Sequence, residues 1–115
     1  MKIIKTLLVL TFLVLLINCG TAEKKVTLAQ EQIKLPTIQC EICKSTIEKA
    51  ISELDGVKSI TVNPEEKIGF IEYDKNIMKI SDIEKAISDL GYQANDLAAN
   101  PEAYTKLPGC CKIPE

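Results

Sequence analysis

The chain has 115 residues and a net charge of −2; 46% of its residues are apolar and 26% are charged. That length is enough for one compact domain and too short for two with good cores. Because the sequence lacks His, Trp and Arg, it excludes serine–histidine hydrolases, imidazole metal sites and arginine-based phosphate grips, and its acidic balance argues against a nucleic-acid partner.

Residues 1–18 have the pattern of an export signal. Two lysines precede an apolar run over residues 6–17, which is too short to span a bilayer core of roughly 30 Å. The run ends in Asn18-Cys19-Gly20, which resembles the lipobox of bacterial lipoproteins, although a small residue is usual where Asn18 stands. We therefore expect a lipid anchor on Cys19 that holds the protein at the periplasmic or extracytoplasmic face of the cell envelope. An uncleaved membrane anchor and an ordinary secretory signal are the alternatives.

Residues 19–31 are mostly polar and are typical of a tether between an anchor and a domain. A β-like run at residues 32–38 begins the predicted domain, which we place at residues 32–97. A C-terminal tail, residues 98–115, follows it.

An internal repeat marks two helices, because the run Ile47–Ser52 recurs as Ile83–Ser88. In each helix the apolar residues fall at i, i+3, i+4 and i+7, which predicts one buried stripe per helix. The stripes are Ile47, Ala50, Ile51 and Leu54 in the first helix and Ile83, Ala86, Ile87 and Leu90 in the second. Ser81 and Glu84 have the spacing of a capping box at the start of the second helix.

Two further β-like runs, residues 57–63 and 67–73, lie between the helices and are separated by an Asn-Pro turn, which predicts a hairpin. A short run at residues 92–95 follows the second helix. The resulting order, β-α-β-β-α-β, predicts an α+β ferredoxin-like fold with a four-stranded antiparallel sheet and both helices on one face.

Cys40 and Cys43 lie where the first predicted strand ends and the first helix begins, and the second half of the repeat has no equivalent thiols. Free N–H groups at a helix N-terminus favour thiolates, and soft thiolates select Cu(I), Zn(II) and Hg(II). Two sulfurs alone suit Cu(I) or Hg(II) better than Zn(II), which prefers four ligands. A disulfide in an oxidising envelope and the redox pair of a thiol-disulfide oxidoreductase remain alternatives, although Glu41-Ile42 does not resemble the residues of a thioredoxin motif.

These residues resemble the heavy-metal-associated domain family, which includes copper chaperones, modules of copper-transporting ATPases and periplasmic mercury-binding proteins. The resemblance covers residues 34–95, and its motifs are the Cys-x-x-Cys pair, Leu54-Asp55-Gly56-Val57, Tyr73-Asp74 and Leu90-Gly91-Tyr92. It implies metal binding by Cys40 and Cys43. It also implies that Ile38, which replaces the family's usual Met, packs in the core, and that Tyr92 lies beside the site. Tyr92 could equally be an ordinary core aromatic.

The tail contains a predicted short helix, started by Asn100 and Pro101, and then Cys110 and Cys111, which we expect to be exposed. A fourth strand antiparallel to the first would end at the far end of the sheet, so the tail would have to travel back to reach a metal. Its length allows that. Cys110 and Cys111 therefore either add sulfurs to the site or form a reactive tail that pairs between molecules.

Together these patterns predict a metal-binding protein that is not an enzyme. The expected ion is Cu(I), with Hg(II) and Zn(II) as the other candidates, and it is passed on or sequestered at the envelope. The expected partners are the ion, a metal-transporting ATPase or another metal-accepting protein, and the membrane.

Overall fold

The computed structural model describes residues 1–6, 20 and 25–114 of the chain. Most of the predicted export signal, the anchor residue Cys19 and tether residues 21–24 lie outside this described part. Among the described residues, no helix combines the length and apolar character that crossing a bilayer requires.

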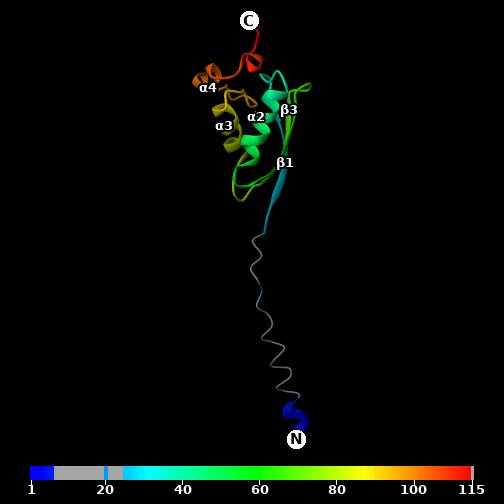
Figure 1. The fold of residues 1–115 in the computed structure, drawn as a ribbon. Coiled ribbons are helices and arrows are strands. Elements are labelled where there is room, and N and C mark those ends of the chain that lie inside the picture. Colours follow the sequence, from blue (N-terminus) through cyan, green and yellow to red (C-terminus); the bar gives the residue numbers. More distant parts are fainter. Residues whose placement is uncertain (7–19, 21–24, 115) are drawn as a thin grey trace.

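One layer of the domain is an antiparallel sheet, which has three strands among the described residues (Figure 1). Its strands lie in the order β1 (Leu28–Lys34), β3 (Ile68–Asp74) and β2 (Val57–Asn63), so β3 is central. The predicted hairpin between β2 and β3 is confirmed. In its turn the Asn63 carbonyl oxygen Oδ1 accepts hydrogen bonds from the backbone N–H groups of Glu65 and Glu66, at 3.0 and 3.1 Å.

β1 begins at Leu28, whereas we predicted a first strand from Gln32 to Ile38, so part of the predicted tether belongs to the sheet. The inner face of β1 explains the difference. Every second residue of the strand lies on that face, and these residues are Ala29, Glu31 and Ile33, so the charged Glu31 interrupts the apolar pattern. The Glu31 carboxylate is accommodated there by a hydrogen bond from the Tyr73 hydroxyl, at 3.2 Å.

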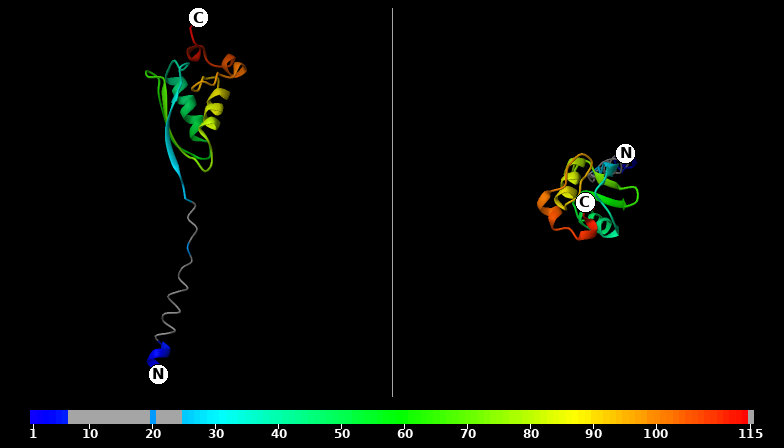
Figure 2. Two further views of the ribbon diagram at one scale, coloured as in Figure 1. Left: turned by 180° about the vertical axis from the view of Figure 1, so that it is seen from behind. Right: turned by 90° about the horizontal axis from the view of Figure 1, so that it is seen from above.

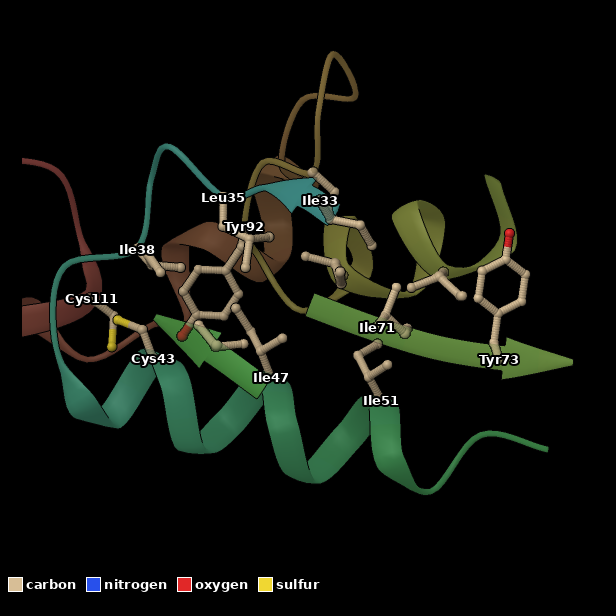
Figure 3. Packing of buried hydrophobic residues seen from close by; sticks show 14 of the residues in the cluster. Ile33, Leu35, Ile38, Cys43, Ile47, Ile51, Ile71, Tyr73, Tyr92 and Cys111 are labelled. Atoms are coloured by element: carbon tan, nitrogen blue, oxygen red, sulfur yellow. The ribbon is translucent and has the colours of Figure 1, made fainter. Parts of the chain in front are cut away.

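Helices α2 (Glu41–Ser52) and α3 (Ile80–Asp89) cover the same face of the sheet, as predicted (Figures 1 and 2). The isoleucines of the two repeated stripes are at most 1% exposed, and Leu54, Ala86 and Leu90 pack partly buried around them. Figure 3 shows Ile47 and Ile51 reaching from α2 toward the β3 side of the core. The α+β architecture with helices on one face is therefore confirmed.

The start of α3 differs from the prediction. Ser81 and Glu84 do not cap it, because the helix already begins at Ile80. Instead the Asp82 carboxylate accepts a hydrogen bond from the backbone N–H of Lys79, at 2.8 Å. A carboxylate in the first turn also interacts favourably with the positive end of the helix dipole.

Residues 92–95 do not form the predicted fourth strand. The backbone N–H of Asn95 donates to the Lys34 carbonyl at 2.8 Å, and the Lys34 N–H donates to the Asn95 side-chain oxygen at 2.8 Å. Asn95 has a positive φ of 51°, so the chain turns away from β1 there, and Ala94 pairs with Leu97. The chain thus leaves the sheet beside the end of β1 that leads to Cys40.

The tail consequently stays at the end of the domain where α2 begins (Figures 1 and 2). Its predicted short helix is confirmed as α4 (Pro101–Thr105), with Asn100 Oδ1 accepting from the backbone N–H groups of Glu102 and Ala103 at 3.0 and 3.2 Å. A 3-10 helix, η1 (Gly109–Cys111), follows and packs against α2.

Candidate metal centre

Cys40 and Cys43 occupy the N-terminus of α2. Cys40 is the N-cap residue and has an extended backbone, while Cys43 lies in the first turn and is completely buried. Both thiols are free, and their sulfur atoms are 3.6 Å apart. The structure thus brings together the two cysteines that sequence analysis selected, at the predicted end of the helix.

The helix N-terminus lowers the pKa of the Cys40 thiol from 9.0 to about 7. The largest cause is a hydrogen bond from the backbone N–H of Cys43, and the thiols of Cys110 and Cys43 and the N–H of Ile42 add to it, while partial burial opposes it. Cys40 therefore loses its proton more readily than an ordinary thiol, which favours its sulfur as a metal ligand.

The structure brings the two tail cysteines to the same place. The sulfur of Cys111 lies 3.9 Å from that of Cys40 and 4.0 Å from that of Cys110. Cys40, Cys110 and Cys111 form a group whose sulfurs are all within 4.8 Å of one another. We call Cys40, Cys43, Cys110 and Cys111 the four-sulfur cluster.

Both tail cysteines were predicted to be exposed. That prediction is confirmed for Cys110 and wrong for Cys111, which is buried. Cys111 is 0% exposed because η1 packs it into the core cluster that also contains Cys43. Burial is the main cause that raises its pKa, and hydrogen bonding to the Cys40 sulfur is the main cause that raises the pKa of Cys110. In the metal-free protein Cys110 and Cys111 therefore hold their protons more tightly than Cys40 does.

Tyr92 lies beside the cluster, as the family resemblance implied. Its side chain is 1% exposed, and its hydroxyl points toward Cys43 and Cys111 (Figure 3). The phenol oxygen is buried and has no hydrogen-bond partner among the described residues. Burial raises the pKa of Tyr92, and the neighbouring sulfurs of Cys111 and Cys43 add to the rise, so the hydroxyl keeps its proton beside the sulfurs.

Ile38 is completely buried in the same core cluster as Cys43 and Tyr92, and it has no atom that could ligate a metal. Its place two residues before Cys40 matches the packing role that the resemblance implied. Its contribution is to help fix the loop between β1 and α2.

Sequence analysis did not identify the turn at Asn95, which decides where the tail lies. The adjacent pair Asn95-Asp96 was the available signal, since Asn and Asp tolerate positive φ and favour turns. It was overlooked because Asn95 was assigned to the predicted β-like run at residues 92–95.

Comparison with known proteins agrees with this geometry, because residues 32–93 match the heavy-metal-associated domain. The chain belongs to the heavy-metal-associated domain family. It is 35% identical over 65 residues to the copper chaperone CopZ of Staphylococcus aureus, an overlap of 56% of this chain and 96% of that protein. The match to the heavy-metal-associated domain ends before Cys110 and Cys111, so the tail cysteines lie beyond it.

Solved structures of MerP and of a potential copper-translocating ATPase domain have a fold similar to that of this chain. Oxidized MerP from Ralstonia metallidurans CH34 superposes with a TM-score of 0.58 at 26% identity, over 60% of this chain and 96% of that one. The N-terminal domain of a potential copper-translocating P-type ATPase from Bacillus subtilis, solved in the Cu(I)-loaded state, gives a TM-score of 0.57 at 25% identity, over 60% of this chain and 86% of that one.

Proposed function

We propose that the chain binds a soft metal ion, Cu(I) in the first place, through Cys40 and Cys43 and carries it to another protein. The observation that carries this proposal is the position of the free Cys40 sulfur, which lies at the N-terminus of α2 and 3.6 Å from the Cys43 sulfur; the backbone N–H of Cys43 there helps to lower the pKa of Cys40 to about 7. Two soft thiolates suit Cu(I) or Hg(II), and Zn(II) would need further ligands. The copper chaperone and the Cu(I)-loaded ATPase domain among the similar proteins support Cu(I).

Transfer would proceed by exchange of sulfur ligands. Cys40 is only partly buried, so the thiolate of an incoming protein can approach the ion from the Cys40 side while the buried Cys43 still holds it. The partner that suits this exchange is a metal-transporting ATPase with a domain of the same fold, because the N-terminal domain of a potential copper-translocating ATPase, solved in the Cu(I)-loaded state, is among the similar structures.

The place of action that we propose is the extracytoplasmic face of the cell envelope, with a lipid anchor on Cys19. The lipobox-like sequence Asn18-Cys19-Gly20 after an apolar run supports it. Mass spectrometry of the mature protein from the membrane fraction should find an acylated Cys19 as the first residue. Recovery of a chain that still starts at an unmodified Met1 would contradict the anchor.

The metal-binding proposal is tested by anaerobic titration of the reduced protein with Cu(I) against a chromophoric chelator. We expect tight binding by the natural chain and by a Ser45→Ala control, which changes an exposed residue of the same helix. We expect the Cys40→Ser/Cys43→Ser variant to lose that binding. If the reduced protein took up no more Cu(I), Hg(II) or Zn(II) than this variant, the proposal would be wrong.

The thiol-disulfide oxidoreductase is the competing function. It predicts catalytic turnover in an insulin-reduction assay, which a metal carrier does not need. We expect no turnover above the Cys40→Ser/Cys43→Ser background, and robust turnover without tight Cu(I) binding would favour the oxidoreductase instead.

A further inference from the structure

We propose that Cys110 and Cys111 are additional ligands of the carried ion, and that residues 100–111 form a clasp that closes over the ion between uptake and delivery. The inference rests on the function proposed above, because it adds ligands to the site formed by Cys40 and Cys43. It changes the expected coordination from two sulfurs to three or four.

The spacing of the sulfurs supports shared coordination. With metal–sulfur bonds of about 2.3 Å, sulfurs around one ion stand about 3.8 Å apart in a tetrahedron, about 4.0 Å in a triangle and about 4.6 Å on a line. The sulfur of Cys40 lies 3.6 Å from Cys43 and 3.9 Å from Cys111, and Cys111 lies 4.0 Å from Cys110. These three distances match coordination by more than two sulfurs, and Cys40 and Cys111 each belong to two of the three pairs.

The Tyr92 hydroxyl is a second, independent observation that points to a ligand here. A buried polar group without a partner costs about 1–3 kcal/mol, so native proteins rarely retain one without a reason. The Tyr92 oxygen is buried and unpartnered among the described residues and faces the sulfurs of Cys43 and Cys111 (Figure 3). When a metal replaces the thiol protons, this hydroxyl can donate to one of the resulting thiolates. The Tyr92 hydroxyl therefore gains a hydrogen-bond acceptor when the metal is bound.

The tail also has a docking place of its own on the domain. A Cβ at Gly91 would lie 3.0 Å from the Ala103 carbonyl carbon and from the Tyr104 nitrogen, so α4 sits directly on the Gly91 backbone. The buried Ser88 hydroxyl donates to the Ala98 carbonyl at 2.7 Å, and the Ser88 carbonyl accepts from the Asn100 N–H at 3.0 Å. These contacts hold the tail on the domain independently of the cysteines.

The four cysteines differ in how accessible they are to solvent. Cys110 is exposed, Cys40 is partly buried, and Cys43 and Cys111 are buried. An incoming thiolate would therefore displace Cys110 first, and opening of the clasp would leave the ion on Cys40 and Cys43. The exchange breaks one metal–sulfur bond for each one formed and releases thiol protons to water on loading, with no change of oxidation state.

The test is X-ray absorption spectroscopy of the full chain loaded anaerobically with one equivalent of Cu(I). We expect three or more sulfur neighbours in the natural protein and two in Cys110→Ser/Cys111→Ser, together with at least a tenfold weaker affinity in the chelator competition. Cys110→Ser alone changes an exposed residue and should remove one sulfur without disturbing the fold, which keeps the test valid if the Cys111 change unfolds the tail.

A further variant tests the docking of the tail separately from the loss of its cysteines. Leu107 packs partly buried against the core, so Leu107→Asp should undock the tail while all four cysteines remain. We expect it to weaken Cu(I) binding like the double cysteine variant, whereas Lys106→Ala, a change of an exposed neighbour, should not.

Two results would overturn the clasp. One is a two-sulfur copper in the natural protein, and the other is an unchanged affinity in Cys110→Ser/Cys111→Ser. If the Cys40→Ser/Cys43→Ser variant still lost binding in the same experiment, only this inference would fail. If that variant also bound normally, the proposed function would fail with it.

Discussion

The sulfurs of Cys40 and Cys111 lie 3.9 Å apart although 71 positions separate the two residues in the sequence. The contact depends on the turn at Asn95, which releases the chain from the sheet beside the end of β1 that leads to Cys40. A fourth strand along the whole of β1 would have carried the tail toward the other end of the sheet. The short pairing of this segment with β1 thus determines which residues can reach the metal.

Selective alkylation should reveal the ionised sulfur. The pKa of Cys40 is lowered to about 7 and that of Cys110 is raised, and only the thiolate reacts with iodoacetamide. In the reduced, metal-free protein we expect labelling of Cys40 to rise through a midpoint near pH 7, while Cys110 reacts only at higher pH although it is more exposed. Peptide mass spectrometry across a pH series measures both.

Denaturation provides the control for that experiment. Unfolding removes the Cys43 N–H and the neighbouring thiols from Cys40, so its pKa should return toward the ordinary thiol value of 9.0. The difference between the two cysteines should then disappear in concentrated urea. Faster labelling of Cys110 than of Cys40 at neutral pH in the folded protein would contradict the assigned ionisation.

The docking of α4 makes Gly91 sensitive to substitution. Gly91 has a φ of 100°, and a Cβ there would lie 3.0 Å from backbone atoms of Ala103 and Tyr104. We expect Gly91→Ala to lower the free energy of unfolding by about 1–3 kcal/mol and to expose the tail to limited proteolysis.

Gly109→Ala is the matched control in the tail, because nothing lies within 4 Å of the added Cβ. It should leave stability unchanged or raise it by up to about 1 kcal/mol. Equal proteolysis of the tail in the two variants would show that α4 does not depend on the close approach at Gly91.

Much of the fold could be predicted because its signals are local. The repeated apolar stripes gave α2 and α3, and the Asn-Pro turn gave the β2–β3 hairpin. Cys40 and Cys43 were found because they sit at a helix N-terminus that the stripe itself locates. β1 was misplaced because its inner face includes Glu31, which is tolerated through a distant partner, Tyr73, that periodicity does not reveal.

The position of the tail could not be predicted from local signals. It depends on the exchange of hydrogen bonds between Asn95 and Lys34 and on the absence of a side chain at Gly91, where α4 packs. Both are contacts between segments far apart in the sequence. The burial of Cys111 follows from them, which is why this cysteine was expected at the surface.

Asn95 should be replaceable by Gly at a smaller cost than by Ala. Both changes remove the oxygen that accepts from the Lys34 N–H, which we expect to cost about 1–2 kcal/mol. Ala must also adopt the positive φ of 51°, which adds about 1 kcal/mol that Gly avoids. Chemical denaturation measures the order, with Asp96→Ala, an exposed neighbour, as a control near zero. Equal losses for Gly and Ala would contradict the role of the backbone conformation.

Tyr92→Phe should affect the metal-free and the loaded protein in opposite directions. In the metal-free protein the change removes a buried oxygen without a partner, so the free energy of unfolding should stay the same or rise by about 1 kcal/mol. In the loaded protein it removes a donor to a thiolate, and Cu(I) affinity should fall by roughly tenfold. Denaturation of the metal-free protein and chelator competition measure the two effects separately.

Tyr104→Phe is the matched comparison, because its hydroxyl oxygen already accepts a hydrogen bond from the Ile113 N–H at 3.0 Å. Removing that acceptor should lower the stability of the metal-free protein by about 0.5–1.5 kcal/mol, the opposite sign to Tyr92→Phe. A purely structural role for the Tyr92 hydroxyl predicts the same sign for both variants and no effect on copper. Lower metal-free stability together with unchanged Cu(I) affinity in Tyr92→Phe would therefore assign its hydroxyl to the core and not to the bound ion.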